Sequence, residues 1–294
     1  MAKRYPVERH LRIRSDGGGN LSNGTYVNIS DECSKLNHRL YRQGMLYDAT
    51  VRLDPDYDGV VDVYVLADTW INNEAWKMAF EKYLDNNAHD SFRKARWSDF
   101  RVDNGIDKSL YTRGNVTTAN SGAGIVVAEQ QTYTAGEFDL SQVTTTSGSE
   151  LEFTWQTLPG GYYNMLTEYD RQGNTDNEPA SVITVTPYEG LNDDTENSQF
   201  EHMQEAGNEP PYNGTGGLGN PWVKVATLRA NSPNANRLSA SIKAMCGFVL
   251  LHGYASSSTP MLSIELKKGD YKGISAEPIG SIVRSKPKGK TKVI

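Results

Sequence analysis

The sequence lacks the features of a membrane, secreted or disulfide-stabilised protein. It contains two cysteines, Cys33 and Cys246, among 294 residues, which is too few for a disulfide framework. No apolar run approaches the roughly 20 residues that cross a bilayer, and the N-terminal MAKRYPVERHLRIR has no apolar centre of the signal-peptide kind. We therefore expect no membrane span, no secretion by a signal peptide, and two unpaired thiols inside a cell.

Motifs of catalysis and of zinc binding are also absent from the sequence. The five histidines form no H-x-x-x-H or H-E-x-x-H pattern, and no G-x-S-x-G occurs. Residues 214–219 (GTGGLG) satisfy G-x-G-x-x-G, but PPYN precedes them and a proline with a strand pattern follows. A dinucleotide site needs a strand before this motif and a helix after it, so we reject that interpretation. We expect no enzymatic activity.

Negative charge predominates overall, although both ends of the chain are basic. Residues 1–14 carry a net charge of +4 and residues 283–294 a net charge of +5, against −6 for the whole chain. Residues 15–282 therefore carry −15. Two basic tails on an acidic body indicate that the tails meet a polyanion and the body does not. The alternative interpretation is that Lys-rich ends only aid solubility.

The stretch from Leu46 to Val102 has the most regular pattern of the chain. Leu46–Asp54 and Val60–Asp68 alternate apolar and polar side chains on either side of a Pro/Asp/Gly turn, which predicts a hairpin of two paired strands. Asn72–Ala95 then has apolar residues at helical spacing, and one of its first two residues, both Asn, is the expected N-cap. A further strand is expected at the end of the stretch.

The remainder of the chain is predicted to be mostly strand and loop. A short helical turn is expected at Lys35–Arg42, a strand or helix at 160–170, and a short helix at 196–206. Strands do not alternate with helices, which favours a single jelly-roll β-sandwich with one or two helices in the inter-strand loops over a βαβ fold. Further strands are predicted at 123–133, 137–143, 150–158, 181–189, 222–230, 245–255 and 261–269.

The predicted turn DPDYDG contains three carboxylates at alternate positions. Asp54, Asp56 and Asp58 followed by Gly59 match the first half of an EF-hand calcium loop. The twelfth position is Val65 instead of Glu, and the flanking segments are strands, so an EF-hand is not expected. Calcium at these three aspartates is the one cofactor we consider, and a solvated turn is the alternative.

The tryptophans allow two interpretations. Several lie near cations, which would suit stacking on bases, or they pin a helix onto a sheet, which is the interpretation we favour. The residues concerned are Trp70, Trp76, Trp97, Trp155 and Trp222, with Arg93, Lys94, Arg96 and Arg101 as the neighbouring cations.

Residues 47–102 resemble the capsid proteins of small circular single-stranded DNA viruses. The resemblance lies in the order of a strand pair, a V-Y-x-L-x-x-x-W phrase, an amphipathic W-K-M-A-F-E-x-Y helix and A-R-W-x-D-F-R, and it covers about a fifth of the chain. It implies a structural protein with a single jelly roll that assembles with copies of itself into a small icosahedral shell. It also implies a genome of single-stranded nucleic acid held by basic arms, and localisation to the virion and, during assembly, to the host cell interior.

The resemblance divides the chain into a basic N-terminal arm with a Gly-rich linker (1–24), a jelly-roll capsid domain (25–275) and a basic C-terminal tail (276–294). Such proteins often have a long Arg-rich arm, whereas this chain has five basic residues in its first fourteen, so we expect both ends to share the binding of nucleic acid. The expected nucleic-acid-binding residues are Lys3, Arg4, Arg9, Arg12, Arg14, Arg284, Lys286, Lys288, Lys290 and Lys292.

Two other functions remain open at this stage. A phage or viral tail or fibre adhesin that binds glycans on a β-sandwich would explain the loops rich in Tyr, Trp and Asn, but not the two basic tails. A β-sandwich hydrolase would need two carboxylates brought together in space, which the sequence neither establishes nor excludes.

Overall fold

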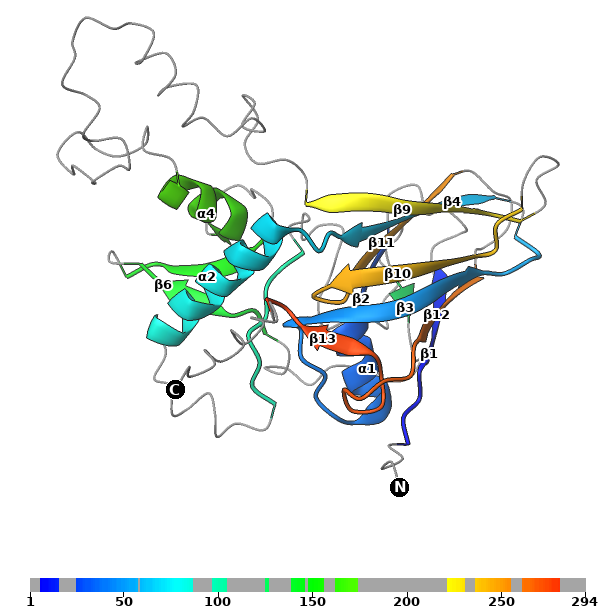
Figure 1. Cartoon of the computed structure of the whole chain (residues 1–294), viewed down its shortest axis with the longest axis horizontal. Coiled ribbons are helices and arrows are strands. Elements are labelled where there is room, and N and C mark those ends of the chain that lie inside the picture. The colour runs from blue at the N-terminus through cyan, green and yellow to red at the C-terminus, as the bar shows by residue number, and fades with distance from the viewer. Residues whose placement is uncertain are drawn as a thin grey trace, which may run out of the picture.

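The described residues form two larger antiparallel sheets and one small sheet (Figure 1). The structure is a computed structural model, and the chain is mainly β. It describes residues 6–15, 25–57, 59–86, 97–104, 125–126, 139–145, 148–155, 162–173, 221–230, 236–254 and 261–280.

The first large sheet, sheet A, contains four main strands in the order β10-β3-β12-β1. Two short strands extend it, because β5 pairs with β1 and β13 pairs with the start of β3. Its strands are β1 (His10–Ser15), β3 (Met45–Leu53), β5 (Ile125–Val126), β10 (Ser239–Met245), β12 (Met261–Leu266) and β13 (Ala276–Pro278).

The second large sheet, sheet B, has the order β2-β11-β4-β9. Together with sheet A it shows a simple rule of pairing, in which the first four strands pair with β9 to β12 in reverse order. The pairs are β1 with β12, β2 with β11, β3 with β10, and β4 with β9. The strands of sheet B are β2 (Thr25–Asn28), β4 (Val60–Leu66), β9 (Trp222–Arg229) and β11 (Phe248–Tyr254).

Aliphatic side chains from both sheets meet in one core, which explains the alternating sequence pattern. Val51 of β3 and Ile264 of β12 face it from sheet A, while Val63 of β4 and Leu251 of β11 face it from sheet B, and all four are fully buried. Burial of such a side chain stabilises the fold by about 1.5–3 kcal/mol. The alternation therefore reports which side of each strand is buried.

The predicted hairpin between residues 46–54 and 60–68 is wrong in its pairing, although both strands exist. β3 pairs with β10, β12 and β13, and β4 pairs with β11 and β9, so the turn between them carries the chain from one sheet to the other. Tyr57 in this turn is 3% exposed and belongs to the core. A Cβ at Gly59 would lie 2.5 Å from the Tyr57 ring, so the buried tyrosine requires glycine there.

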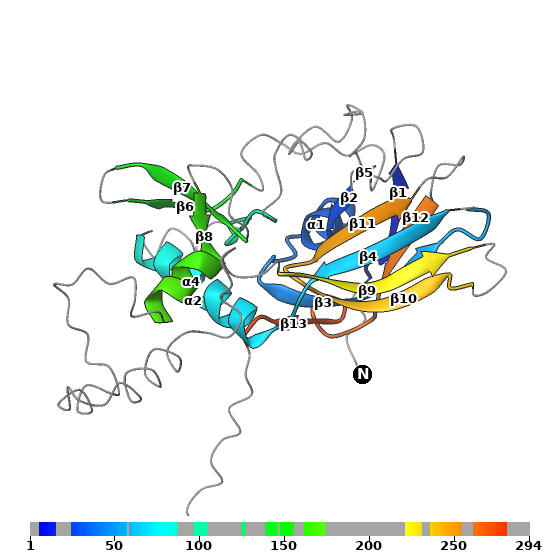
Figure 2. The same cartoon turned by 90° about the horizontal axis from the view of Figure 1, so that it is seen from above.

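The connection between β4 and β9, residues 67–221, contains most of the other elements and is called the insertion below. It starts and ends at one point, where the Ala67 N–H donates to the Pro221 carbonyl at 3.0 Å. Its short strand β5 extends sheet A, and Figure 2 shows its other described elements grouped at one end of the two large sheets. They are α2 (Trp70–Asn86), β6 (Gln142–Thr144), β7 (Glu150–Thr154), β8 (Tyr162–Asn164) and α4 (Met165–Gly173).

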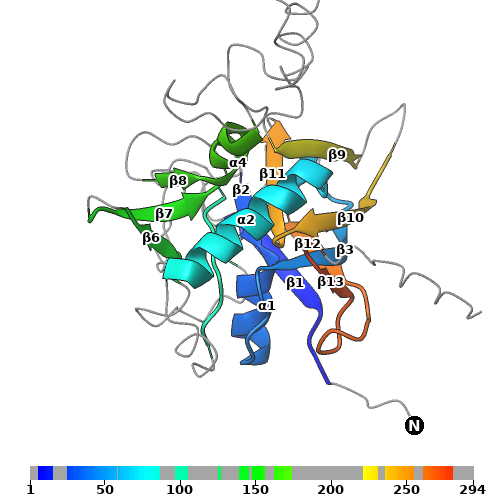
Figure 3. The same ribbon diagram turned by 60° about the vertical axis from the view of Figure 1, so that its left-hand side comes forward.

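A second, aromatic core joins the insertion to the sandwich. Trp76 of α2 stacks on Phe80 at 5.2 Å between ring centroids, and Phe100 meets Phe153 of β7 edge-on at 5.1 Å. Residues of the large sheets, such as Phe248, belong to the same cluster. In Figure 3, α2 crosses in front of the ends of the sandwich strands. The packing interpretation of the tryptophans is confirmed for Trp76, Trp155 and Trp222, which are at most 8% exposed, whereas Trp70 is 66% and Trp97 38% exposed.

Both predicted helix boundaries need correction. α2 begins at Trp70, two residues before the expected start, because Thr69 Oγ1 accepts the Asn72 N–H at 3.3 Å. It ends at Asn86, and residues 87–96 lie outside the described part. The helix near Lys35 is α1 (Ile29–Asn37), which Asn28 caps by accepting the N–H groups of Ser30 and Asp31.

The predicted boundaries of the two tails are also wrong. β1 lies within the expected arm of residues 1–24, where it pairs with β12 over five residues. β13 lies within the expected tail that begins at residue 276. The strand and helix predicted at 181–189 and 196–206 lie outside the described residues. No helix in the described part of the chain is long and apolar enough to cross a membrane.

Candidate functional site

The outer face of sheet A is polar and basic, and it is the best described candidate for contact with a polyanion. Residues paired across neighbouring strands project from the same face. Because Leu11, Val51 and Ile264 point into the core, their sequence neighbours point outward. One cross-strand row of this face contains Arg12, Ser263, Arg52 and Ser239, and the next contains His10, Glu265, Thr50 and Ser241.

Cations exceed carboxylates on this face. Arg52 pairs with Glu265 at 2.9 Å, and Lys267, just after β12, pairs with Asp48 at 2.7 Å. Two further exposed cations, Arg12 and Lys243, have no ion pair within the described part of the chain. Asp48 and Glu265 are thus neutralised locally. Glu277 of β13 is exposed and projects from the same face, because it is paired opposite Leu46, so the described charged residues of this face sum to +1.

The outer face of sheet B has the opposite character. One of its cross-strand rows joins Tyr26, Leu250, Tyr64 and Lys224. The first three of these are half-buried and pack against the aromatic core shared with the insertion. Among the described residues, sheet A therefore presents a polar face of the sandwich, and sheet B presents an apolar face that is partly covered.

Charge is also unevenly divided between the insertion and the rest of the chain. The insertion contains 24 acidic and 9 basic residues, a net charge of −15. The rest of the chain contains 12 acidic and 21 basic residues, a net charge of +9. The acidic body inferred from the sequence is therefore the insertion, because the sandwich between the basic ends (15–66 and 222–282) has 11 residues of each sign.

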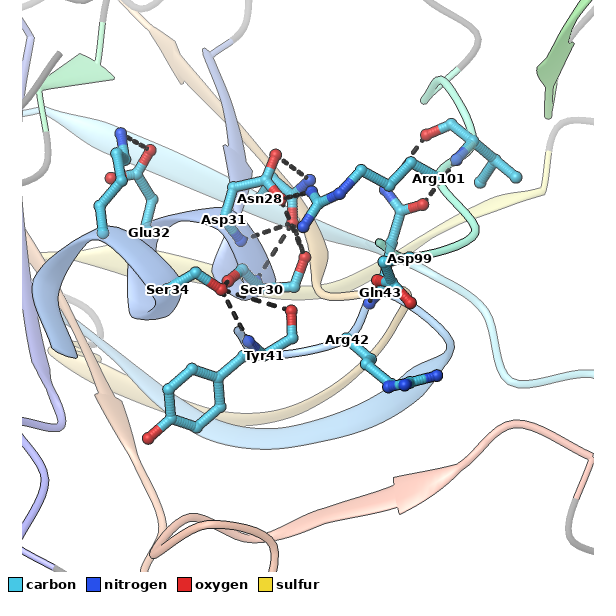
Figure 4. Close-up of polar contacts among 12 residues, drawn as sticks. Asn28, Ser30, Asp31, Glu32, Ser34, Tyr41, Arg42, Gln43, Asp99 and Arg101 are labelled. Atoms are coloured by element: carbon cyan, nitrogen blue, oxygen red, sulfur yellow. Dashed lines mark hydrogen bonds and ion pairs between the residues drawn. The ribbon is translucent and has the colours of Figure 1, made fainter. Parts of the chain in front are cut away.

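A buried polar cluster links the insertion to the sandwich (Figure 4). Arg101 donates from Nη1 to Asp31 Oδ1, and the two side chains are 2% and 4% exposed. Asn28 Nδ2 donates to the other oxygen of Asp31 at 2.8 Å. The carboxylate that begins α1 is thus held by a cation and by the helix cap together.

Gln43 and Asp99 form the second part of this cluster. The side-chain amide of Gln43 accepts the Val102 N–H at 2.6 Å and donates to the Val102 carbonyl at 3.1 Å. It therefore bonds to Val102 as the backbone of a neighbouring strand would. The Gln43 N–H donates to Asp99 Oδ2 at 2.7 Å. Burial raises the pKa of Asp99 to about 6, although the nearby Arg101 and the Gln43 N–H oppose this.

Residues 101–103 are also hydrogen-bonded to other parts of the insertion, at Ser141 and around β7. The Ser141 N–H donates to the Arg101 carbonyl at 2.9 Å, and the Arg101 N–H donates to the side-chain Oγ of Ser141 at 2.9 Å. Asp103 N donates to Phe153 O at 2.8 Å, and Trp155 N donates to Asp103 O at 3.3 Å. Residues 99–104, which we call the strap, therefore tie the insertion to α1 and Gln43. The carboxylates of Asp31 and Asp99 are used in this structural bonding.

The predicted nucleic-acid-binding residues divide into two groups. Arg9, Arg12 and Arg14 were expected on an unstructured arm, but the Arg9 carbonyl accepts the Leu266 N–H at 3.0 Å and the other two lie within β1. The alternation of HLRIRS was the available signal for this strand. The other predicted residues lie outside the described part: Lys3, Arg4, Arg284, Lys286, Lys288, Lys290 and Lys292.

The proposed calcium turn is described only in part. Asp54 Oδ1 accepts the Asp56 N–H at 3.0 Å, so this carboxylate stabilises the turn itself. Asp58 lies outside the described residues. Among the residues that are described, no group of three His, Cys, Asp or Glu side chains is placed to hold a metal ion, and calcium binding here stays a prediction.

Two parts of the site were missed from the sequence. Arg52 is on β3 and Lys243 is on β10, and each strand has an alternating sequence pattern. That they share one face follows from the pairing of β3 with β10, which the sequence pattern of either strand alone cannot show. Asp31 and Arg101 are 70 residues apart. Comparison of the chain with models of protein families, with curated proteins and with solved structures finds no match.

Proposed function

We propose that this protein is a structural capsid protein that assembles with copies of itself into a closed shell around single-stranded nucleic acid. The observation that carries the proposal is the order of pairing. An antiparallel ribbon whose first four strands pair in reverse with the last four, and which is rolled into two facing sheets, is a jelly roll. Sheet orders β10-β3-β12-β1 and β2-β11-β4-β9 support that finer assignment.

Jelly rolls also serve lectins and cupin enzymes, so the fold alone does not choose the function. The interior of this sandwich is filled by aliphatic side chains such as Val63, Leu228 and Ile264, all fully buried. This supports a packed scaffold over a site in the sandwich interior. The carboxylates of the buried cluster hold the strap in place, which is a structural role.

The distribution of charge supports nucleic acid as the enclosed partner. The basic ends, residues 1–14 and 283–294, carry +4 and +5, and the sandwich between them is neutral. Counterion release makes each phosphate contact favourable at moderate salt, and repetition of a short tail over many subunits multiplies the effect. The proposed sites of action are the virion and, during assembly, the host cell interior.

Negative-stain electron microscopy of the purified protein, with the ratio of absorbance at 260 and 280 nm, tests the proposal. Uniform closed particles with a raised ratio are expected. Monomers or small oligomers with a pure protein spectrum, at every salt and calcium concentration tried, would contradict it.

A further inference from the structure

We infer that the outer face of sheet A binds a phosphodiester backbone directly, as a folded site separate from the two basic tails. The inference rests on the proposed function, because it concerns the same nucleic acid. It adds to that function a binding surface on the folded sandwich, which recognises the backbone of the nucleic acid and not its bases.

The cations of this face have the spread that a nucleic-acid strand requires. Arg12 and Arg52 lie in one row, two strands apart, which is about 10 Å at the usual spacing of strands. Lys243 lies opposite Asp48, four residues along β3 from Arg52, or about 14 Å away along the strand. One strand of nucleic acid lying across the sheet would meet several cations in turn.

The residues between the cations suit close approach of phosphates. Ser263 and Ser239 alternate with Arg12 and Arg52 in the first row, and Thr50 and Ser241 lie side by side in the second row, next to Glu265. The Ser and Thr side chains are short, so they leave the face flat, and hydroxyl groups donate to phosphate oxygens. In these two rows no position has the ring of Tyr, Trp or Phe on which a base would stack. The face should therefore recognise the backbone and not the bases.

The same face continues into the N-terminal basic run. β1, which carries Arg12, is the first strand, and Arg9 precedes it with its carbonyl bonded to Leu266. In the sequence, Lys3 and Arg4 precede Arg9 by six and five residues. A polyanion held by the N-terminal run would lie close to Arg12.

Salt dependence of binding by the full-length protein tests the inference. Each phosphate contact adds about 0.7 to the slope of log affinity against log salt for a single strand. Arg12→Gln with Lys243→Gln should make that slope about 1.4 shallower for labelled oligo(dT). The matched control, Lys82→Gln with Arg229→Gln, removes the same charge from exposed positions outside sheet A and should keep the wild-type slope.

An abasic oligonucleotide of equal length separates backbone from base recognition. It should bind the wild type as oligo(dT) does and lose the same slope in the Arg12/Lys243 variant. Unchanged slopes in both variants would assign all contacts to the tails, and equal losses in both would mean that only net charge matters; either result overturns the inference. If closed particles containing nucleic acid still form, the proposed function survives that failure, whereas a wild type without salt-dependent binding would refute both.

Discussion

Replacing Arg101 with methionine should destabilise the protein far more than breaking an ion pair at the surface. The Arg101 and Asp31 side chains are 2% and 4% exposed, and removal of one partner from a buried pair costs about 3–5 kcal/mol because the other charge stays buried. Asp31 keeps Asn28 Nδ2 as a donor at 2.8 Å, and it shares the single hydroxyl proton of Ser30 (3.3 Å) with Asn28 Oδ1, which lies closer at 2.6 Å. We therefore expect a loss near the lower value, about 3 kcal/mol.

Arg52→Met is the matched control, because it breaks a pair whose side chains are 58% and 31% exposed. Such a pair contributes less than about 1 kcal/mol. Urea unfolding followed by tryptophan fluorescence measures both variants. Adding Asp31→Asn to Arg101→Met removes the stranded charge and should recover part of the loss. Equal losses of unfolding free energy in Arg101→Met and Arg52→Met would refute the reasoning that the contact between the insertion and α1 depends on a buried charge pair.

Two further predictions concern the strap and a turn. The raised pKa of Asp99 means that the folded protein retains a proton that the unfolded chain releases, so stability should fall as the pH rises from 3.8 towards about 6. Asp99→Asn should abolish this fall in a series of thermal melts, and an unchanged profile would contradict it. Gly247 has φ +74°, and a Cβ there would lie 3.0 Å from Ser30 N, whereas Gly148 has φ +84° with open space around it. Both Gly→Ala changes should cost about 1 kcal/mol in backbone strain, and Gly247→Ala should lower the melting temperature further; equal losses would mean that crowding at Ser30 is unimportant.

The sequence was sufficient to predict strands, but it was not sufficient to pair them. Leu46–Leu53 and Val60–Leu66 alternate because each has one side in the core, and that holds whether the two strands are neighbours or face each other. Proximity in sequence favoured a hairpin, whereas the fold depends on β3 pairing with β10, nearly 200 residues later.

Charge counts from the sequence were correct in total but assigned to the wrong structural unit. The acidic body could be located only from the structure, where the hydrogen bond between Ala67 and Pro221 shows that residues 67–221 form one insertion between β4 and β9. In the same way, the basic character of residues 9–14 concealed the alternation that places Arg12 on a strand. Gln43 and Arg101 gave no local signal, because each acts through a partner far along the chain.

The hydrogen bond between Ala67 and Pro221, where the insertion begins and ends, has a consequence for how proteins with this fold can diversify. The Ala67 N–H donates to the Pro221 carbonyl at 3.0 Å, directly after the Leu66–Trp222 pair that ends the β4–β9 ladder. The intervening segment can therefore lengthen, shorten or be exchanged without moving the register of either strand. Related chains can therefore differ in this segment while they keep the same two large sheets. For the same reason this position is the natural graft point for displaying a foreign peptide, provided that the graft restores a partner for Phe248.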